Sequence, residues 1–195
     1  PGALHRDLRV VAQHLHAQAE RRVGHLDADR PEADDAEMLW AEILSRHGLK
    51  GCFCVVGEEA RALRDRGRRD VIEALSKHEI AYHSDLHSAH PTHAEYLDEV
   101  SWDDGLSRVL EEESRGVSDV AATFGQWPSA YCKPGSSWAP QVPHAFAKLD
   151  IPVFCDAPFE LAPGIPLRYV GSSLIKYHTS FDRYFDRPAG SRLPS

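Results

Sequence analysis

Short apolar runs alternate with amphipathic stretches along most of the chain. The apolar runs predict strands at Arg22–Asp27, Gly51–Val56, Ile80–His83, Ser129–Cys132, Pro152–Cys155, Leu167–Val170 and Leu174–Tyr177. Apolar residues at helical spacing predict helices at Ala33–Arg46, Arg69–Lys77, Asp103–Thr123 and Val142–Leu149. Because strands that alternate with helices form parallel βαβ units, the pattern predicts an α/β fold.

About seven strands favour an α/β barrel of parallel strands over a six-stranded open sheet. In both architectures, functional groups gather just after the carboxyl ends of the strands. Pro1 to Arg21 predicts an amphipathic helix, and Arg183 to Ser195 is rich in Pro, Gly and Arg, as in a tail. We therefore expect residues 1–195 to form a single domain.

The balance of acidic and basic residues indicates which classes of partner the chain can bind. A net charge of −8 with 30 acidic against 22 basic residues argues against a nucleic-acid partner, which requires clustered Lys and Arg. No apolar run approaches the roughly 18 residues that a membrane span needs. We expect a cytoplasmic protein, and secretion stays open because the chain begins at Pro1 and not at a methionine.

The four cysteines, Cys52, Cys54, Cys132 and Cys155, form no CxxC pair or other zinc spacing. Each lies in a short apolar run, where a free cysteine behaves as a small buried hydrophobe. We expect core residues, with a disulfide or a redox role as the alternatives.

The segment His83-Ser-Asp-Leu-His87 directly follows an apolar strand. Two imidazoles at positions i and i+4 point the same way if the backbone makes one helical turn, and they then present two neutral nitrogens to one cation. The alternative is a polar surface loop that is rich in histidine. His90 and His93, further along this segment, are expected to shape the loop and not to bind metal.

Asp27 ends a predicted strand, and Asp29 lies two residues after it. In a metal hydrolase, two such carboxylates divide the work, because one binds the cation and the other accepts a proton from water. An Asx turn or helix cap leading to Pro31 is the alternative. Together with the histidine pair, the aspartates favour a metal site.

Three segments of the chain resemble the polysaccharide deacetylases, carbohydrate esterase family 4. These segments are Asp27-Ala-Asp29 after a strand, Gly48–Gly57 (Gly-Leu-Lys-Gly-Cys-Phe-Cys-Val-Val-Gly), and His83-Ser84-x-x-His87. The resemblance extends over roughly Val23 to His178. It implies a distorted (β/α) barrel and hydrolysis of an amide bond.

The resemblance also implies roles for individual residues. Asp29, His83 and His87 would hold a divalent cation, with Asp27 as the general base and His178 as a candidate general acid. Zinc is expected from its availability, and cobalt or nickel would also suit three protein ligands.

The chain departs from the family pattern at three places. Ala28 separates two aspartates that are usually adjacent, so the roles of Asp27 and Asp29 could be exchanged. The family's Arg-x-Pro motif appears as Cys132-Lys133-Pro134, with Lys133 in a catalytic position in place of the arginine that orients the base. The final Leu-x-His becomes Leu174-Ile-Lys-Tyr-His178.

Three more residues are candidate substrate contacts. Trp138 could stack on a sugar ring or pack over the barrel end. Asp156 lies at a strand end, where it could contact Lys133 or the substrate, or form a turn before Pro158. Tyr131 begins the segment whose backbone N–H groups could stabilise an oxyanion.

The sequence thus predicts a metal-dependent hydrolase of a non-peptide amide bond, with a carbohydrate or a small-molecule amide as its substrate. An N-deacetylase of an N-acetylated sugar is the expected activity. Two alternatives stay open: a hydrolase of ureide or formamide C–N bonds, and a barrel that keeps its metal and binds carbohydrate without catalysis.

Overall fold

The computed structural model describes residues 10–11, 31–162 and 165–176. Asp27, Asp29 and His178 therefore lie outside the described residues, as does the predicted tail. The strands are β1 (Val10–Val11), β2 (Gly51–Val55), β3 (Glu79–Tyr82), β4 (Tyr131–Cys132), β5 (Val153–Cys155), β6 (Leu167–Tyr169) and β7 (Ser172–Leu174). The helices are α2 (Pro31–Arg46), α3 (Gly57–Asp65), α4 (Arg69–Leu75), α5 (His93–Tyr96), α6 (Trp102–Phe124) and α7 (Gln141–Lys148).

The described strands form one mixed sheet, in the order β1-β2-β3-β4-β5-β7-β6. All neighbouring pairs are parallel except β6 and β7, which are antiparallel. The predicted α/β class is confirmed, but the prediction that every strand is parallel is wrong at β6. Only Val170 and Gly171 connect β6 to β7, and so short a link can join only antiparallel strands.

The sheet curves toward the face that carries the cysteines. The Sγ atoms of Cys54 in β2 and Cys132 in β4 lie 2.8 Å apart although β3 runs between these strands. In a flat sheet the strands on either side of a third are roughly 9–10 Å apart. The curvature agrees with a barrel-like form, but β1 and β6 stay at opposite edges in the described part of the chain, so a closed barrel is not observed.

The cysteines are packed as expected. None of the four forms a disulfide, and Cys52, Cys132 and Cys155 are buried together with Ala81 and Ala130. Cys54 is half-buried against this cluster. Small side chains on the curved face allow the strands to approach one another there. The prediction that the cysteines are core residues is confirmed.

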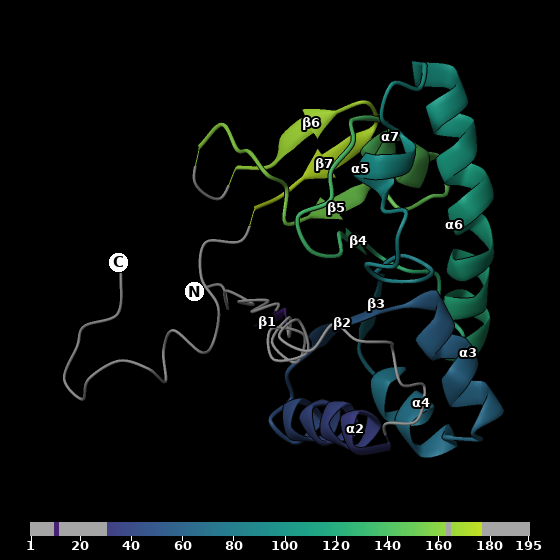
Figure 1. The fold of residues 1–195 in the computed structure, drawn as a ribbon. Helices are drawn as coiled ribbons and strands as arrows, with labels where there is room; N and C mark the ends of the chain where they lie inside the picture. The colour runs from purple at the N-terminus through teal and green to yellow at the C-terminus, as the bar shows by residue number, and fades with distance from the viewer. Residues whose placement is uncertain (1–9, 12–30, 163–164, 177–195) are drawn as a thin grey trace, which may run out of the picture.

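The larger hydrophobic core lies on the other face of the sheet, under the helices. Tyr82, Tyr131, Phe146 and Phe154 are among its largest buried side chains, and the Tyr131 ring stacks on Phe146 with centroids 3.9 Å apart. The long helix α6 runs along this side with α3 beside it (Figure 1). None of the described helices is long and apolar enough to cross a bilayer.

Two predicted elements differ from the observed ones, and a third cannot be compared with the structure. Val10–Val11 form β1 beside β2, so the predicted helix over Pro1 to Arg21 is wrong there, since two β-branched residues favour an edge strand. The predicted strand Arg22–Asp27 lies outside the described residues. The last strand begins at Ser172, directly after the turn at Gly171 (φ 89°), and ends at Leu174, whereas the prediction placed it at Leu174–Tyr177.

Two carboxyl groups near the start of α2 and α3 have raised pKa values. Burial and the neighbouring Glu59 raise the pKa of Glu37 to about 8. Burial and Asp34 raise the pKa of Glu59 to about 7. Since the folded protein holds these protons more tightly than the unfolded chain does, folding is favoured below the ordinary glutamate pKa near 4.5. This stabilisation is lost as the pH rises through 7 to 8.

Glu37→Gln is expected to remove much of this pH dependence. At pH 5 the variant should lie within about 1 kcal/mol of the parent, because the folded parent also carries a neutral side chain at position 37 and only the unfolded chain is ionised there. At pH 8.5 it should be more stable by about 1–3 kcal/mol, since one pKa unit corresponds to roughly 1.4 kcal/mol and the half-buried site is partly screened. Urea unfolding at both pH values measures this, with the exposed Glu73→Gln as control. Equal gains at pH 5 and pH 8.5 would contradict it.

Candidate active site

Three sequence-predicted site residues lie on one edge of the sheet. His83, Lys133 and Asp156 each directly follow a strand, namely β3, β4 and β5. These neighbouring strands are parallel, so their carboxyl ends lie at the same edge. The prediction that these residues follow strand ends is confirmed.

His83 is buried at the end of β3. Its Nδ1 lies 2.6 Å from the carbonyl oxygen of Cys132 in β4, so the ring donates this N–H to the backbone. In the neutral imidazole the lone pair then sits on Nε2. This is the common arrangement of a metal-binding histidine, whose second nitrogen is fixed by a backbone carbonyl or a carboxylate.

The His87 ring lies next to that of His83, with centroids 4.9 Å apart and an interplanar angle of 61°. The segment between them forms no helical turn, so the condition under which the i and i+4 spacing alone would align the two imidazoles is not met. Ser84 (φ 66°) and His87 (φ 55°) instead adopt left-handed conformations, and Ser84 Oγ donates to His87 O over 3.0 Å. The two rings come together through a compact irregular loop.

The two imidazoles suit a divalent cation. Neutral histidine nitrogens are typical ligands of zinc, and a catalytic zinc site needs one further protein ligand. Residues 31–162 and 165–176 contain no group of three His, Cys, Asp or Glu side chains that could hold a metal ion. The predicted third ligand, Asp29, lies outside the described residues, so it stays a prediction.

Lys133 and Asp156 form an ion pair beside this site. Lys133 Nζ lies 3.2 Å from Asp156 Oδ2, and it also donates to the carbonyl oxygen of Gly135. The Lys133 side chain is only 8% exposed, whereas that of Asp156 is 45% exposed. Of the predicted alternatives for Asp156, contact with Lys133 is observed. Its contact with a substrate stays a prediction.

The remaining two substrate candidates pack against the protein. The Trp138 ring meets Phe154 and Phe159 edge to face, with centroids 5.3 Å apart in both pairs. Tyr131 is fully buried and its hydroxyl lies 3.4 Å from His93 Nδ1. For Trp138 the packing alternative is therefore observed, and a substrate contact of either ring stays a prediction.

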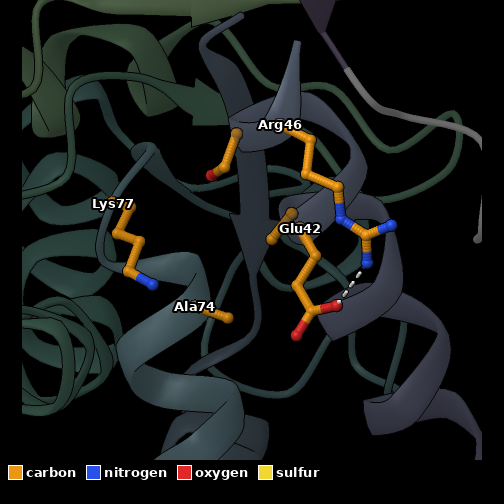
Figure 2. Close-up of a pocket in the computed structure, with 6 residues that line it drawn as sticks. Glu42, Arg46, Ala74 and Lys77 are labelled. Atoms are coloured by element: carbon orange, nitrogen blue, oxygen red, sulfur yellow. Dashed lines mark hydrogen bonds and ion pairs between the residues drawn. The ribbon is translucent and has the colours of Figure 1, made fainter. Parts of the chain in front are cut away.

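A separate pocket lies between α2 and α4, lined by Ala41, Glu42, Ser45, Arg46, Ala74 and Lys77 (Figure 2). Its charged rim is partly neutralised, because Arg46 Nη2 pairs with Glu42 Oε2 at 3.2 Å. These residues lie near the ends of α2 and α4, just before β2 and β3 begin. The pocket therefore lies near the amino ends of the strands, whereas His83 lies at their carboxyl ends.

Sequence reasoning missed a buried carboxylate behind the histidine loop. Glu113 in α6 is buried and contacts Tyr82, Asp85 and His93. A signal was present, because Glu113 lies four residues from Val109 and from Val117 on the apolar face of this helix. A charged residue in such a stripe needs hydrogen-bond partners in the core.

No family model matches the sequence, and comparison with curated proteins finds no significant match. Among solved structures, the chain is similar to a family 4 carbohydrate esterase from Streptomyces lividans in complex with acetate, at 16% identity and a TM-score of 0.43, over 68% of this chain and 57% of that one. It is also similar to a putative polysaccharide deacetylase from Mycobacterium smegmatis, at 22% identity and a TM-score of 0.47, over 76% of this chain and 46% of that one.

The chain therefore spans about half the length of the solved structures that it matches. By description these are a carbohydrate esterase and a putative polysaccharide deacetylase, and the likeness to them is distant. The function is accordingly inferred from the residues of the site.

Proposed function

We propose that this chain is a divergent polysaccharide deacetylase, a metal-dependent hydrolase that removes the acetyl group from an N-acetylated sugar. The observation that carries the proposal is the pair of adjacent imidazoles of His83 and His87 at the carboxyl end of β3. The hydrogen bond from His83 Nδ1 to Cys132 O directs the Nε2 lone pair outward from that backbone contact, as a metal ligand requires.

Asp29, His83 and His87 would hold the cation in this proposal. Held by these residues, a divalent cation would supply polarisation of an acyl oxygen and a lowered pKa of bound water. Zinc is the expected ion, because its preferred ligands are imidazole and carboxylate, and cobalt or nickel would also fit.

Asp27 is proposed to accept the proton of the attacking water, and His178 to protonate the amine that leaves. The positive charge of Lys133 would keep Asp27 ionised, since an opposite charge within about 4–6 Å favours the charged carboxylate. Lys133 already pairs with Asp156, so its ammonium group would be shared by two carboxylates. A flexible ammonium orients a carboxylate less strictly than a guanidinium does.

Acetate release from an N-acetylglucosamine oligomer tests the proposed function. The protein is first stripped of metal with a chelator and then supplied with zinc or cobalt. We expect acetate release only after metal is returned. Cation binding without release of acetate from any N-acetylated sugar would instead favour the carbohydrate-binding alternative. Release of ammonia or formate from a ureide or formamide, and no acetate, would favour the other hydrolase.

A further inference from the structure

The loop that carries His83 and His87 needs support from outside itself. Ser84 and His87 both adopt left-handed backbone conformations, which cost an ordinary residue free energy and persist only where the surroundings impose them. The backbone of this loop is held first by α3, because Gly57 N donates to Ser84 O over 3.0 Å and Glu58 N donates to Asp85 O over 2.9 Å.

Asp85, midway between the two histidines, is fixed on both its side chain and its backbone. Arg61 of α3 holds its carboxylate with two nitrogens, at 2.6 Å and 3.2 Å. Its backbone N–H donates to Glu113 Oε2 over 3.0 Å. A bidentate arginine contact of this kind is both strong and directional.

Glu113 connects this loop to β3, the strand that precedes it. Tyr82, the residue before His83, donates its hydroxyl to Glu113 Oε2 over 2.5 Å. At the far end of the loop, His93 Nε2 lies 2.8 Å from Glu113 Oε1.

Through His93, the contacts of Glu113 extend to β4, the strand whose backbone accepts a hydrogen bond from His83. Tyr131 stands next to Cys132, whose carbonyl oxygen accepts from His83, and the Tyr131 hydroxyl lies 3.4 Å from His93 Nδ1. His93 is itself buried, which agrees with the expectation that it shapes the loop. One carboxylate therefore fastens the start, the middle and the end of the histidine loop.

We propose that Glu113 is a positioning residue that holds the His83–His87 loop in its cation-binding conformation through Tyr82, Asp85 and His93. This inference rests on the proposed function, since it assigns the two histidines to a cation. Glu113 lies behind the loop and acts on the site through these three residues, not by touching the cation.

The main test is Glu113→Gln, which keeps the size of the side chain but replaces one acceptor oxygen by an NH₂ donor. We expect its affinity for zinc, measured by competition with a chelator, to fall about 10- to 100-fold. The visible absorption spectrum of the cobalt-substituted protein should also change, because it reports the ligand geometry. Glu112→Gln, an exposed neighbour on α6, should leave both unchanged.

Val109→Ala separates positioning from general destabilisation. Val109 is fully buried one helical turn before Glu113. We expect its truncation to lower stability while every partner of Glu113 is kept. If Val109→Ala changes cation affinity and the cobalt spectrum as much as Glu113→Gln does, or if Glu113→Gln matches the parent, the proposal is overturned. Tyr82→Phe removes only the hydroxyl, and we expect it to lower the affinity for zinc less than Glu113→Gln does. This variant still tests the proposal if Glu113→Gln does not fold.

Amide hydrogen exchange of the metal-free protein tests the positioning without any cation. The Asp85 amide should exchange about 10- to 100-fold faster in Glu113→Gln than in Val109→Ala, because a hydrogen bond to a charged acceptor is lost. Equal exchange in the two variants overturns the proposal. A parent protein that protects this amide but binds no zinc or cobalt would contradict the proposed function, while the positioning of the loop would stand.

Discussion

Asp27→Asn is expected to reduce deacetylation by about 10²- to 10⁴-fold while leaving the metal content near that of the parent. This range is the usual contribution of a general base, and asparagine cannot accept the proton of water. The resemblance to polysaccharide deacetylases assigns the base to Asp27 and a metal ligand to Asp29. Asp29→Asn is therefore expected to lose the cation and the activity together.

Metal content by elemental analysis and acetate release from the same preparations distinguish the two aspartates. Asp65→Asn, an exposed position on α3, serves as the matched control and should behave like the parent. If Asp27→Asn loses the metal while Asp29→Asn keeps it, Ala28 has exchanged the roles of the two carboxylates. Normal activity in both variants would show that neither aspartate belongs to the active site.

Gly57→Ala and Gly116→Ala are each expected to destabilise the protein by about 2–3 kcal/mol, because the new methyl group has no room. A Cβ at Gly57 would lie 2.1 Å from Asp85 Oδ1 and 2.9 Å from the Gly116 Cα. A Cβ at Gly116 would lie 2.2 Å from the Tyr82 hydroxyl and 2.5 Å from Asp85 Oδ1. In α6, alanine's better helix propensity, roughly 1 kcal/mol, offsets only part of that cost.

Thermal unfolding measures this effect, with an expected decrease in Tm of roughly 5–10 °C for a chain of this size. Gly105→Ala is the matched control in α6, because its new Cβ would approach only side-chain atoms, the nearest at 3.1 Å from Gln141 Nε2. Its Tm should stay near that of the parent. If Gly116→Ala is as stable as Gly105→Ala, then α3, α6 and Asp85 pack less closely than these distances indicate.

The two glycines also explain why Asp85 can reach its partners. They leave a slot between α3 and α6 that admits the Asp85 side chain. Displacing that side chain would disturb the Arg61 pair and the amide contact with Glu113. We therefore expect the stability loss in either alanine variant to be accompanied by a weaker cation site.

Local patterns in the sequence determined most of the secondary structure and part of the site. The apolar runs identified β2 to β5, and the helical spacing identified α2, α4, α6 and α7 nearly to their ends. The order of strands and helices then predicted that His83, Lys133 and Asp156 would follow strand ends. These features could be predicted because burial periodicity and strand direction are properties of short segments.

Only the tertiary structure decided which distant residues meet. The pairing of Lys133 with Asp156, the place of Asp85 between two glycines, and the contacts of Glu113 join segments far apart in the chain. The left-handed backbone at Ser84 and His87 is likewise imposed from outside the loop. No local pattern specifies such contacts, because they depend on how closely α3 and α6 approach the end of β3, and that distance is set by packing.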